Sequence, residues 1–307
     1  MYYPYLRGKQ YELLALRDLL MERKLSKKII PIIEPVKETT SFKKTVDYFL
    51  DKDHTLYTIV NPKVGEYSIY DNTHPIHGER CSFENDALLV DNTSNNLFYD
   101  FSKFKKPQNL IVIYNDFDSI DYGKKFLSDN SLSSKLNLVP DGSRFLRQFN
   151  QEPMGIIRDA FAKKDRNVDY LETPEEFFSD DHLYYQEQYE AFSDYSITGK
   201  SYIDGGFAPI AVAIHIVFFD KNDVLRIRHF VSDTNEDITD PAGKFNEALS
   251  KLIKWAETID EKNESISLEQ FRKLSSEKRY PGLGFVKKLC IMHHLEIMGK
   301  FLDSRGS

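Results

Sequence analysis

The residues best suited to chemistry are charged groups that directly follow apolar, strand-like segments of the chain. Basic groups can neutralise an oxyanion, and carboxylates can hold a divalent metal or move a proton. We expect this mixture to bind a ligand that carries phosphate or carboxylate, and solvated turns and helix caps are the alternative. The candidates are Arg7, Lys9, Glu34, Lys63, Asp116 and Arg144.

Glu34 stands out because it lies inside the apolar run IIPIIEPV, between Pro31 and Pro35. An unpaired buried carboxylate costs several kcal/mol, so this side chain must reach the sheet edge or find a partner. Lys9 is the partner that we expect. Two interpretations stay open, a catalytic or metal-binding carboxylate and a structural ion pair.

The acidic segment DFDSID, residues 116–121, could contribute ligands to a divalent metal. It lacks the glycine and the distal glutamate that an EF-hand loop requires. A capping and turn segment is the alternative. Asp116 is therefore a candidate metal ligand or base.

Two histidines, His215 and His229, lie in the strand-like runs APIAVAIHIVFF and VLRIRHFVSD, which only DKND separates. A three-residue turn at 221–223 places the two histidines directly opposite each other, whereas a two-residue turn puts them on opposite faces. We expect either a joint catalytic or metal-binding role, with His215 or His229 transferring a proton, or core histidines satisfied by carbonyl groups.

The loop YPGLG precedes the last apolar stretch of the chain. Gly282 and Gly284 leave backbone N–H groups accessible, a helix N-terminus adds positive potential, and Lys287 and Lys288 follow closely. The loop therefore predicts an anion site, and a plain Pro-Gly turn is the alternative.

The elements that must position these residues alternate between strand and helix in the first half of the chain. Strand-like runs occur at YYPYL, 29–36, 56–62, 109–116 and 135–141, and helix-spaced leucines and phenylalanines lie between them. This alternation predicts an α/β protein with a TIM-barrel-like (β/α) barrel. An open doubly wound sheet is second, because no GxGxxG fingerprint follows the first strand.

The second half is less regular. The DKND gap is too short for a helical crossover, so we expect an antiparallel hairpin at about 210–232. We interpret the aromatic and acidic region 177–208 as an insertion and 285–302 as a C-terminal helix. No linker is evident, so one barrel-like domain over 1–307 is the simplest division.

Composition limits the classes of function. The net charge of −7 argues against a surface built as a whole for nucleic acid. The two cysteines, Cys81 and Cys290, fit a reducing compartment, and no apolar run is long enough to span a membrane. We expect a cytoplasmic protein that does not contact the membrane.

The chain also resembles a known family. YYPYLRGKQYELLAL followed by IIPIIEP is similar to the opening of the phage and bacterial "beta protein" family, and FSDDHLYY, FSDY, AVAIHI, RHFVSD and YPGLGFVKKLCIMHHLE resemble a bacterial branch of it. The resemblance implies a TIM-barrel-like fold, a mobile-element or phage-defence context and a protein partner encoded nearby. Motif positions of the family coincide with Lys9, Glu34, Asp181, His182, Asp194, His215, His229 and His294.

Two functions are consistent with these features. The first is an enzyme that binds a phosphate-containing ligand, a nucleotide or a nucleic-acid end, at the C-terminal face of the barrel. The alternative is a non-catalytic scaffold that docks a second protein through 177–208.

Overall fold

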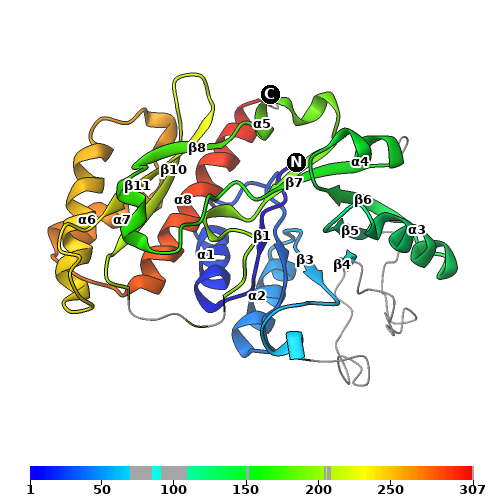
Figure 1. Cartoon of the computed structure of the whole chain (residues 1–307), viewed down its shortest axis with the longest axis horizontal. Coiled ribbons are helices and arrows are strands. Elements are labelled where there is room, and N and C mark those ends of the chain that lie inside the picture. Colours follow the sequence, from blue (N-terminus) through cyan, green and yellow to red (C-terminus); the bar gives the residue numbers. More distant parts are fainter. Residues whose placement is uncertain (70–84, 91–108, 150–151, 204, 206–208, 306–307) are drawn as a thin grey trace. The chain divides into compact units, whose positions relative to one another are not determined.

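The computed structural model describes residues 1–69, 85–90, 109–149, 152–203, 205 and 209–305 (Figure 1). Cys81 lies outside these residues. The chain divides into two compact units, which we name the barrel unit and the hairpin unit. The barrel unit comprises Met1–Lys9, Ile29–Asp159 and Tyr184–Tyr195, and the hairpin unit comprises Gln10–Lys28, Ala160–Leu183 and Ser196–Ser307. The single domain expected over 1–307 stays a prediction.

The barrel unit contains a parallel sheet of eight strands within the described residues. In spatial order these are β1 (Tyr5–Leu6), β2 (Ile32–Ile33), β3 (Tyr57–Ile59), β4 (Asp86–Val90), β5 (Leu110–Tyr114), β6 (Ser134–Val139), β7 (Met154–Arg158) and β9 (Ala191–Asp194). Tyr2 bridges both Ile29 and Phe192, and the Tyr3 N–H donates to the Phe192 carbonyl over 2.9 Å. The first strand segment thus pairs with the last, and the sheet nearly closes. The predicted TIM-barrel-like fold is confirmed.

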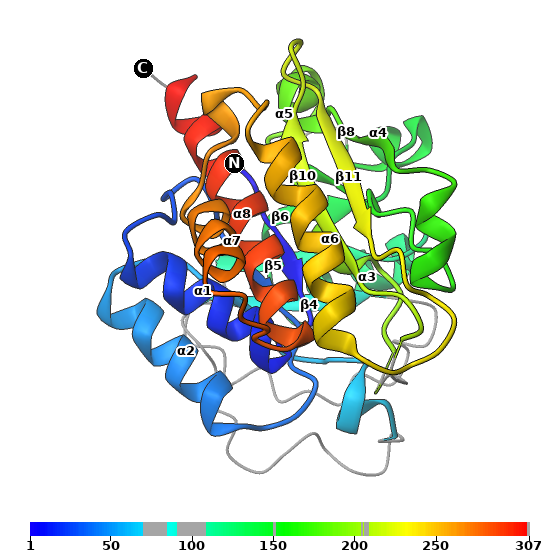
Figure 2. The same cartoon turned by 90° about the vertical axis from the view of Figure 1, so that its left-hand side faces the viewer.

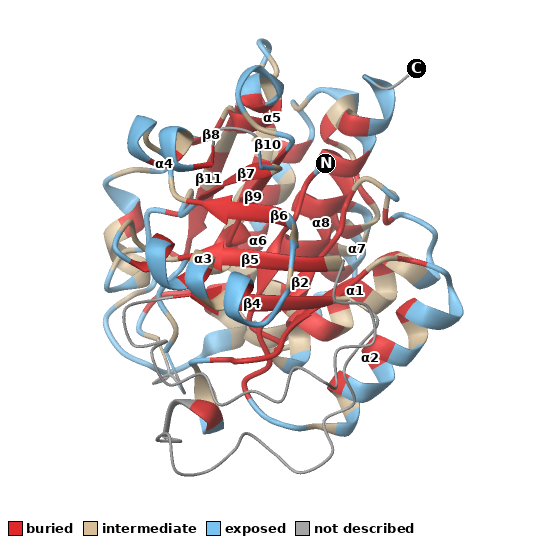
Figure 3. Cartoon of the chain, turned by 90° about the vertical axis from the view of Figure 1, so that its right-hand side faces the viewer, coloured by how far each residue is buried: buried red, intermediate tan, exposed pale blue. Residues whose placement is uncertain are grey.

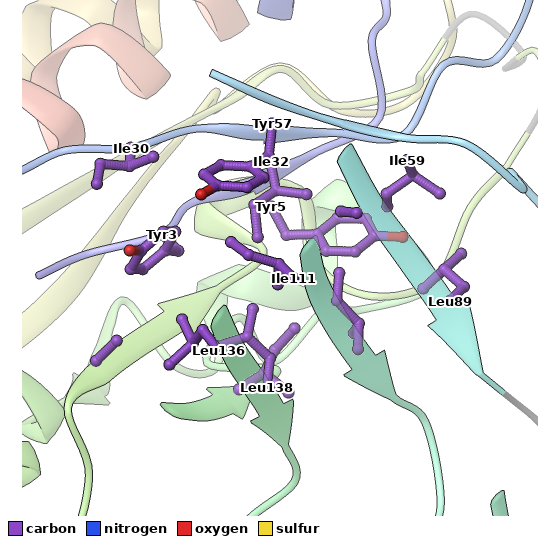
Figure 4. Close-up of a cluster of buried hydrophobic side chains, with 14 of the residues drawn as sticks. Tyr3, Tyr5, Ile30, Ile32, Tyr57, Ile59, Leu89, Ile111, Leu136 and Leu138 are labelled. Atoms are coloured by element: carbon purple, nitrogen blue, oxygen red, sulfur yellow. The ribbon is translucent and has the colours of Figure 1, made fainter. Parts of the chain in front are cut away.

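Alternation along each strand separates the barrel interior from its outer layer. On β5, Ile111 and Ile113 enter the interior cluster, whereas Val112 and Tyr114 pack outward. Strands buried on both faces read as continuous apolar runs, as LIVIY does. Figure 3 shows β4 and β5 buried along their lengths, and Figure 4 shows side chains such as Ile111 gathered in the interior. The interior is therefore a packed core.

Three helices of the barrel unit follow from local signals. They are α2 (Thr40–Asp51), α3 (Ser119–Asp129) and α4 (Ser143–Gln148). The Thr39 hydroxyl caps α2 by accepting from the Phe42 N–H over 3.1 Å. The stripe of Phe42, Val46 and Phe49 is buried, as the helical spacing requires.

Three strands of the barrel unit, β4, β7 and β9, were not predicted from the sequence. The last of these lies within 177–208, so residues 191–194 complete the barrel and are not inserted. The strand β8 (Glu175–Ser179), which this region also contains in part, belongs to the other unit. Each missed strand contains a charged or glycine residue, Asp86, Gly155 or Asp194, and so lacks the continuous apolar run that marked β5.

The hairpin unit is built on an antiparallel sheet with the order β10-β11-β8. The strands β10 (Ala213–Phe219) and β11 (Leu225–Val231) form the predicted hairpin, and α6 (Pro241–Ala256) lies along it in Figure 2. The Asp220 N–H donates to the Val224 carbonyl over 2.9 Å, which leaves a three-residue turn, and His215 pairs with His229. The conditional prediction of opposite histidines is confirmed.

The main helices that the structure describes in this unit are α1 (Gln10–Met21), α6 (Pro241–Ala256), α7 (Ile266–Ser276) and α8 (Leu283–Ser304). The short elements are η5 (Asn167–Leu171), α5 (Asp181–Tyr184), η7 (Ser196–Thr198) and η8 (Glu261–Asn263), while η1 (Gly65–Ile69) and η6 (Tyr185–Glu187) belong to the barrel unit. The predicted C-terminal helix is confirmed as α8. Among the described residues, no helix is long and apolar enough to cross a membrane.

Substitution of Gly65 tests how closely the barrel unit is packed. Its φ is +63°, and an added Cβ would lie 2.1 Å from the Val36 carbonyl oxygen. We expect Gly65→Ala to lower the free energy of unfolding by about 2–4 kcal/mol, because strain and overlap add. Urea denaturation measures this. Gly205→Ala is the control, since Gly205 also has positive φ but open space around it; equal losses in the two variants would contradict the packing argument.

Candidate functional site

At the C-terminal ends of β1, β2 and β3, Glu34 forms the centre of a buried polar cluster. Its side chain is fully buried and forms an ion pair with Arg7. The carboxylate also accepts hydrogen bonds from the Tyr5 hydroxyl over 2.7 Å and from the Lys63 backbone N–H over 2.7 Å. The Arg7 guanidinium lies 4.9 Å from the Tyr5 ring centroid and 5.5 Å from that of Tyr195. Glu34 is thereby satisfied by protein groups from three consecutive strand ends.

Strand register explains why Arg7 is the partner of Glu34. Leu6 pairs with Ile33, and the Glu34 N–H donates to the Leu6 carbonyl. The residues that follow this pair, Arg7 and Glu34, therefore lie next to each other. The ion pair that the structure gives Glu34 is with Arg7, and the one expected with Lys9 stays a prediction. Lys9 is half-buried beyond the turn at Gly8.

The other candidates of the barrel unit have local contacts. The Asp116 carboxylate accepts from the Ser119 N–H over 2.8 Å, in the turn that precedes α3. The Arg144 guanidinium lies 3.9 Å from the Phe117 ring centroid, and the Lys63 side chain is exposed. Over the described part of the chain, no group of three or more His, Cys, Asp or Glu side chains is placed to hold a metal.

In the hairpin unit, Glu176, His229 and His215 form a chain of hydrogen bonds, which we name the histidine relay. The Nδ1 atoms of the two histidines are 2.7 Å apart, and His229 Nε2 lies 3.2 Å from the Glu176 carboxylate. A carboxylate only accepts, so His229 presents Nε2–H to it and accepts at Nδ1 from His215. The lone pair of His215 is then on Nε2.

A pocket of about 280 Å³ in the same unit is lined by His215, and we name it the hairpin pocket. Its lining also includes Lys163, Lys164, Lys287 and Tyr170. The Tyr170 ring packs against both histidines, with centroid distances of 4.7 and 4.4 Å. The relay therefore ends at a pocket that carries three lysines.

Burial keeps both imidazoles of the histidine relay uncharged, because it lowers the pKa of each. Desolvation, followed by the nearby His229 and Lys287, lowers the pKa of His215 to about 3. Desolvation also lowers the pKa of His229, against the opposing effect of Glu176. Both imidazoles are neutral at neutral pH, so His215 can accept a hydrogen bond or a proton from a ligand.

The YPGLG loop contributes to the hairpin pocket through the residues beside its glycines. Gly282 has a φ of +88°, and a Cβ on Gly284 would lie 2.1 Å from the Tyr11 ring, so Gly284 permits close packing. Leu283 and Lys287 line the pocket. The anion role expected for the two glycines stays a prediction.

Lys287 and the neighbouring Lys288 have acidic partners. Lys287 lies 3.8 Å from Glu12, and Lys288 lies 2.6 Å from Asp18. The structure thus brings Lys287 and His215 together in one unit. Of the other candidates, Arg7, Glu34 and Lys63 meet in the barrel unit.

The sequence alone did not single out Lys164, Tyr170 or Glu176. The adjacent lysines at 163 and 164 were a signal that could have been used. Glu176 had none, because its place beside His229 depends on β8 pairing with β11.

Two adjacent histidines of α8 are core residues. His293 is fully buried, with Nδ1 2.8 Å from the Ser265 hydroxyl and Nε2 2.8 Å from the Val217 carbonyl. His294 is equally buried, 2.9 Å from the Ser196 hydroxyl. Both side chains are thus held by partners inside the hairpin unit.

The Arg7–Glu34 pair gives a stability prediction. Arg7→Met leaves the Glu34 carboxylate buried without its cation, so we expect the free energy of unfolding to fall by about 3–5 kcal/mol. Lys43→Met is the control, because Lys43 pairs with Glu38 at 63% and 57% side-chain exposure. The control should change stability by less than about 0.5 kcal/mol. Equal effects in urea denaturation would contradict a structural role for the pair.

Buried neutral histidines predict a pH dependence of stability. Burial lowers the pKa of His293 and His294 to about 3 and that of His182 to about 4. The unfolded chain binds these protons near pH 6.5, so stability is complete above about pH 7 and falls as the pH drops toward about 4. Each histidine contributes up to about 1.4 kcal/mol per pH unit in that window.

Urea denaturation at several pH values between about 7 and 5 measures this slope. His293→Gln should flatten it by about the contribution of one proton. Stability that does not change over this range would show that these groups titrate normally.

Comparisons with known proteins add nothing to the roles assigned to these residues. No protein-family model matches the chain, and no curated protein or solved structure matches it. The "beta protein" resemblance and the context that it implies therefore stay expectations.

Proposed function

We propose that the protein is an enzyme that acts on a phosphate-containing ligand, such as a nucleotide or a nucleic-acid end, held in the hairpin pocket. The observation that carries the proposal is the histidine relay, because it ends at His215 in the lining of this pocket. The relay supplies a proton acceptor, and the lysines of the pocket supply the positive charge that neutralises a phosphate group.

Charge supports the choice of ligand. The pocket lining contains three lysines, Lys163, Lys164 and Lys287, against a single acid, Asp165. Lysine is a common phosphate ligand because its ammonium group is a compact charge. Lys287 is also near Glu12, so part of its charge is balanced within the protein.

His215 is the residue that we expect to move a proton. An anion bound beside it favours the protonated imidazole and raises its pKa toward the range in which a general base works. Glu176 stabilises that proton through His229, which accepts from His215 and donates to the carboxylate. The step is the transfer of a proton from a hydroxyl group or a water of the substrate to His215 Nε2.

The C-terminal end of the barrel is the second candidate location for the ligand. There, Glu34 and Tyr5 orient the guanidinium of Arg7. The Glu34 carboxylate is already hydrogen-bonded on both oxygens, which favours the hairpin pocket for catalysis.

Docking of a second protein is the alternative function. One observation favours it: Phe177 is 54% exposed on β8, an edge strand of the hairpin-unit sheet in the described part of the chain. An edge strand offers backbone groups to a strand from another chain. The region 177–208 would then be the contact surface of a scaffold.

NMR of isotope-labelled histidine rings tests the enzyme proposal. Inorganic phosphate, added near pH 7 where the fold is stable, should shift the ring resonances of His215 saturably, because an anion bound beside the imidazole favours its protonated form. Lys164→Met and Lys287→Met should each weaken this effect several-fold, whereas Lys221→Met, which changes an exposed lysine of the hairpin turn, should not. His215 ring resonances that phosphate leaves unchanged would overturn the proposal. If, in addition to that result, Phe177→Asp abolished the capture of a partner protein, the scaffold function would replace the enzyme proposal.

A further inference from the structure

We propose that a second pocket of the hairpin unit, beside Trp255, binds the planar base of a nucleoside phosphate. The pocket has a volume of about 520 Å³ and a mainly apolar lining that includes Arg228, Phe230, Lys251, Lys254 and Trp255. We name it the tryptophan pocket. Its size falls in the range of small-molecule sites, roughly 300–1,000 Å³.

The aromatic wall is held in place before a ligand arrives. Trp255 packs against Phe218 with centroids 5.1 Å apart at 72° and against Phe230 at 5.4 Å and 54°. These contacts come from the last turn of α6 and from both strands of the hairpin. Trp255 is nevertheless only half-buried, and its remaining surface lines the pocket. A fixed, partly exposed indole is a suitable platform for stacking a flat ring.

Cations lie around this platform. The Arg228 guanidinium lies 5.9 Å from the ring centroids of both Trp255 and Phe230, and Glu175 holds it over 3.2 Å. Lys251 is fixed by the Val231 carbonyl and Asp233, whereas the Lys254 side chain is exposed. Rings combined with cations select a ligand that is both flat and anionic.

A nucleoside phosphate fits these features better than a long nucleic acid does. The net charge of −7 disfavours a polyanion that extends over the surface. The tryptophan pocket offers one ring platform and one exposed lysine, which match one base and one phosphate group. The proposal does not depend on the function proposed above, because the two pockets share no lining residue.

His229 belongs to the lining of the tryptophan pocket, but its side chain is fully buried and bonds to His215 and Glu176. The histidine relay therefore takes no part in this proposal.

Trp255 is the single tryptophan of the chain, so its fluorescence reports on this pocket directly. We expect AMP to quench the emission with a saturable dependence on concentration. Adenosine should do the same more weakly, since it lacks the phosphate, and ribose 5-phosphate should have no effect, since it lacks the base. Equal responses to AMP and ribose 5-phosphate, or no response to AMP at millimolar concentration, would overturn the proposal.

Matched lysine variants locate the binding site. Lys254→Ala should weaken AMP binding by about three- to tenfold, while Lys221→Ala should leave it unchanged. Unchanged binding in Lys254→Ala would place the ligand elsewhere and overturn the proposal. The phosphate titration of His215 is a separate readout, so failure of one proposal is distinguishable from failure of the other.

Discussion

The barrel unit depends on the backbone pairing between its first and last strand segments. Parallel strands leave N–H and C=O groups unpaired at both edges of an open sheet. Here Tyr2 bridges Ile29 on one side and Phe192 on the other, and its hydroxyl donates to the Asp194 carboxylate over 2.6 Å. This closure gives the interior side chains a common core, with Tyr5, Ile32 and Ile111 in one cluster.

The same register places the charged strand ends. Because Leu6 pairs with Ile33, Arg7 and Glu34 follow as neighbours, and the pair is removed from water. Burying two charges is costly unless the geometry is good and the remaining oxygens are hydrogen-bonded. The Tyr5 hydroxyl and the Lys63 N–H meet that condition by bonding to the Glu34 carboxylate. The cluster therefore joins three strand ends through protein groups alone.

In the hairpin unit, the three-residue turn between β10 and β11 determines which side chains of the two strands are neighbours. It sets His215 opposite His229, and the pairing of β8 with β11 then supplies Glu176. The two imidazoles lie on one face of the sheet, where His215 lines the pocket with three lysines, whereas Trp255 packs on Phe230. The relay of neutral imidazoles supports the proposed enzyme function, whereas the nucleotide proposal rests on Trp255 and the cations around it.

Features that depend on local spacing could be predicted from the amino-acid sequence. The strand and helix periods predicted the barrel and the short DKND gap predicted the hairpin, whereas opposite histidines followed only for the longer of two possible turns. Tertiary structure decided which groups meet: Arg7 with Glu34, Glu176 with His229, and Lys164 with Lys287 in one pocket. Local patterns fix the period of an element, whereas register between distant strands fixes its neighbours, and only the folded backbone sets that register.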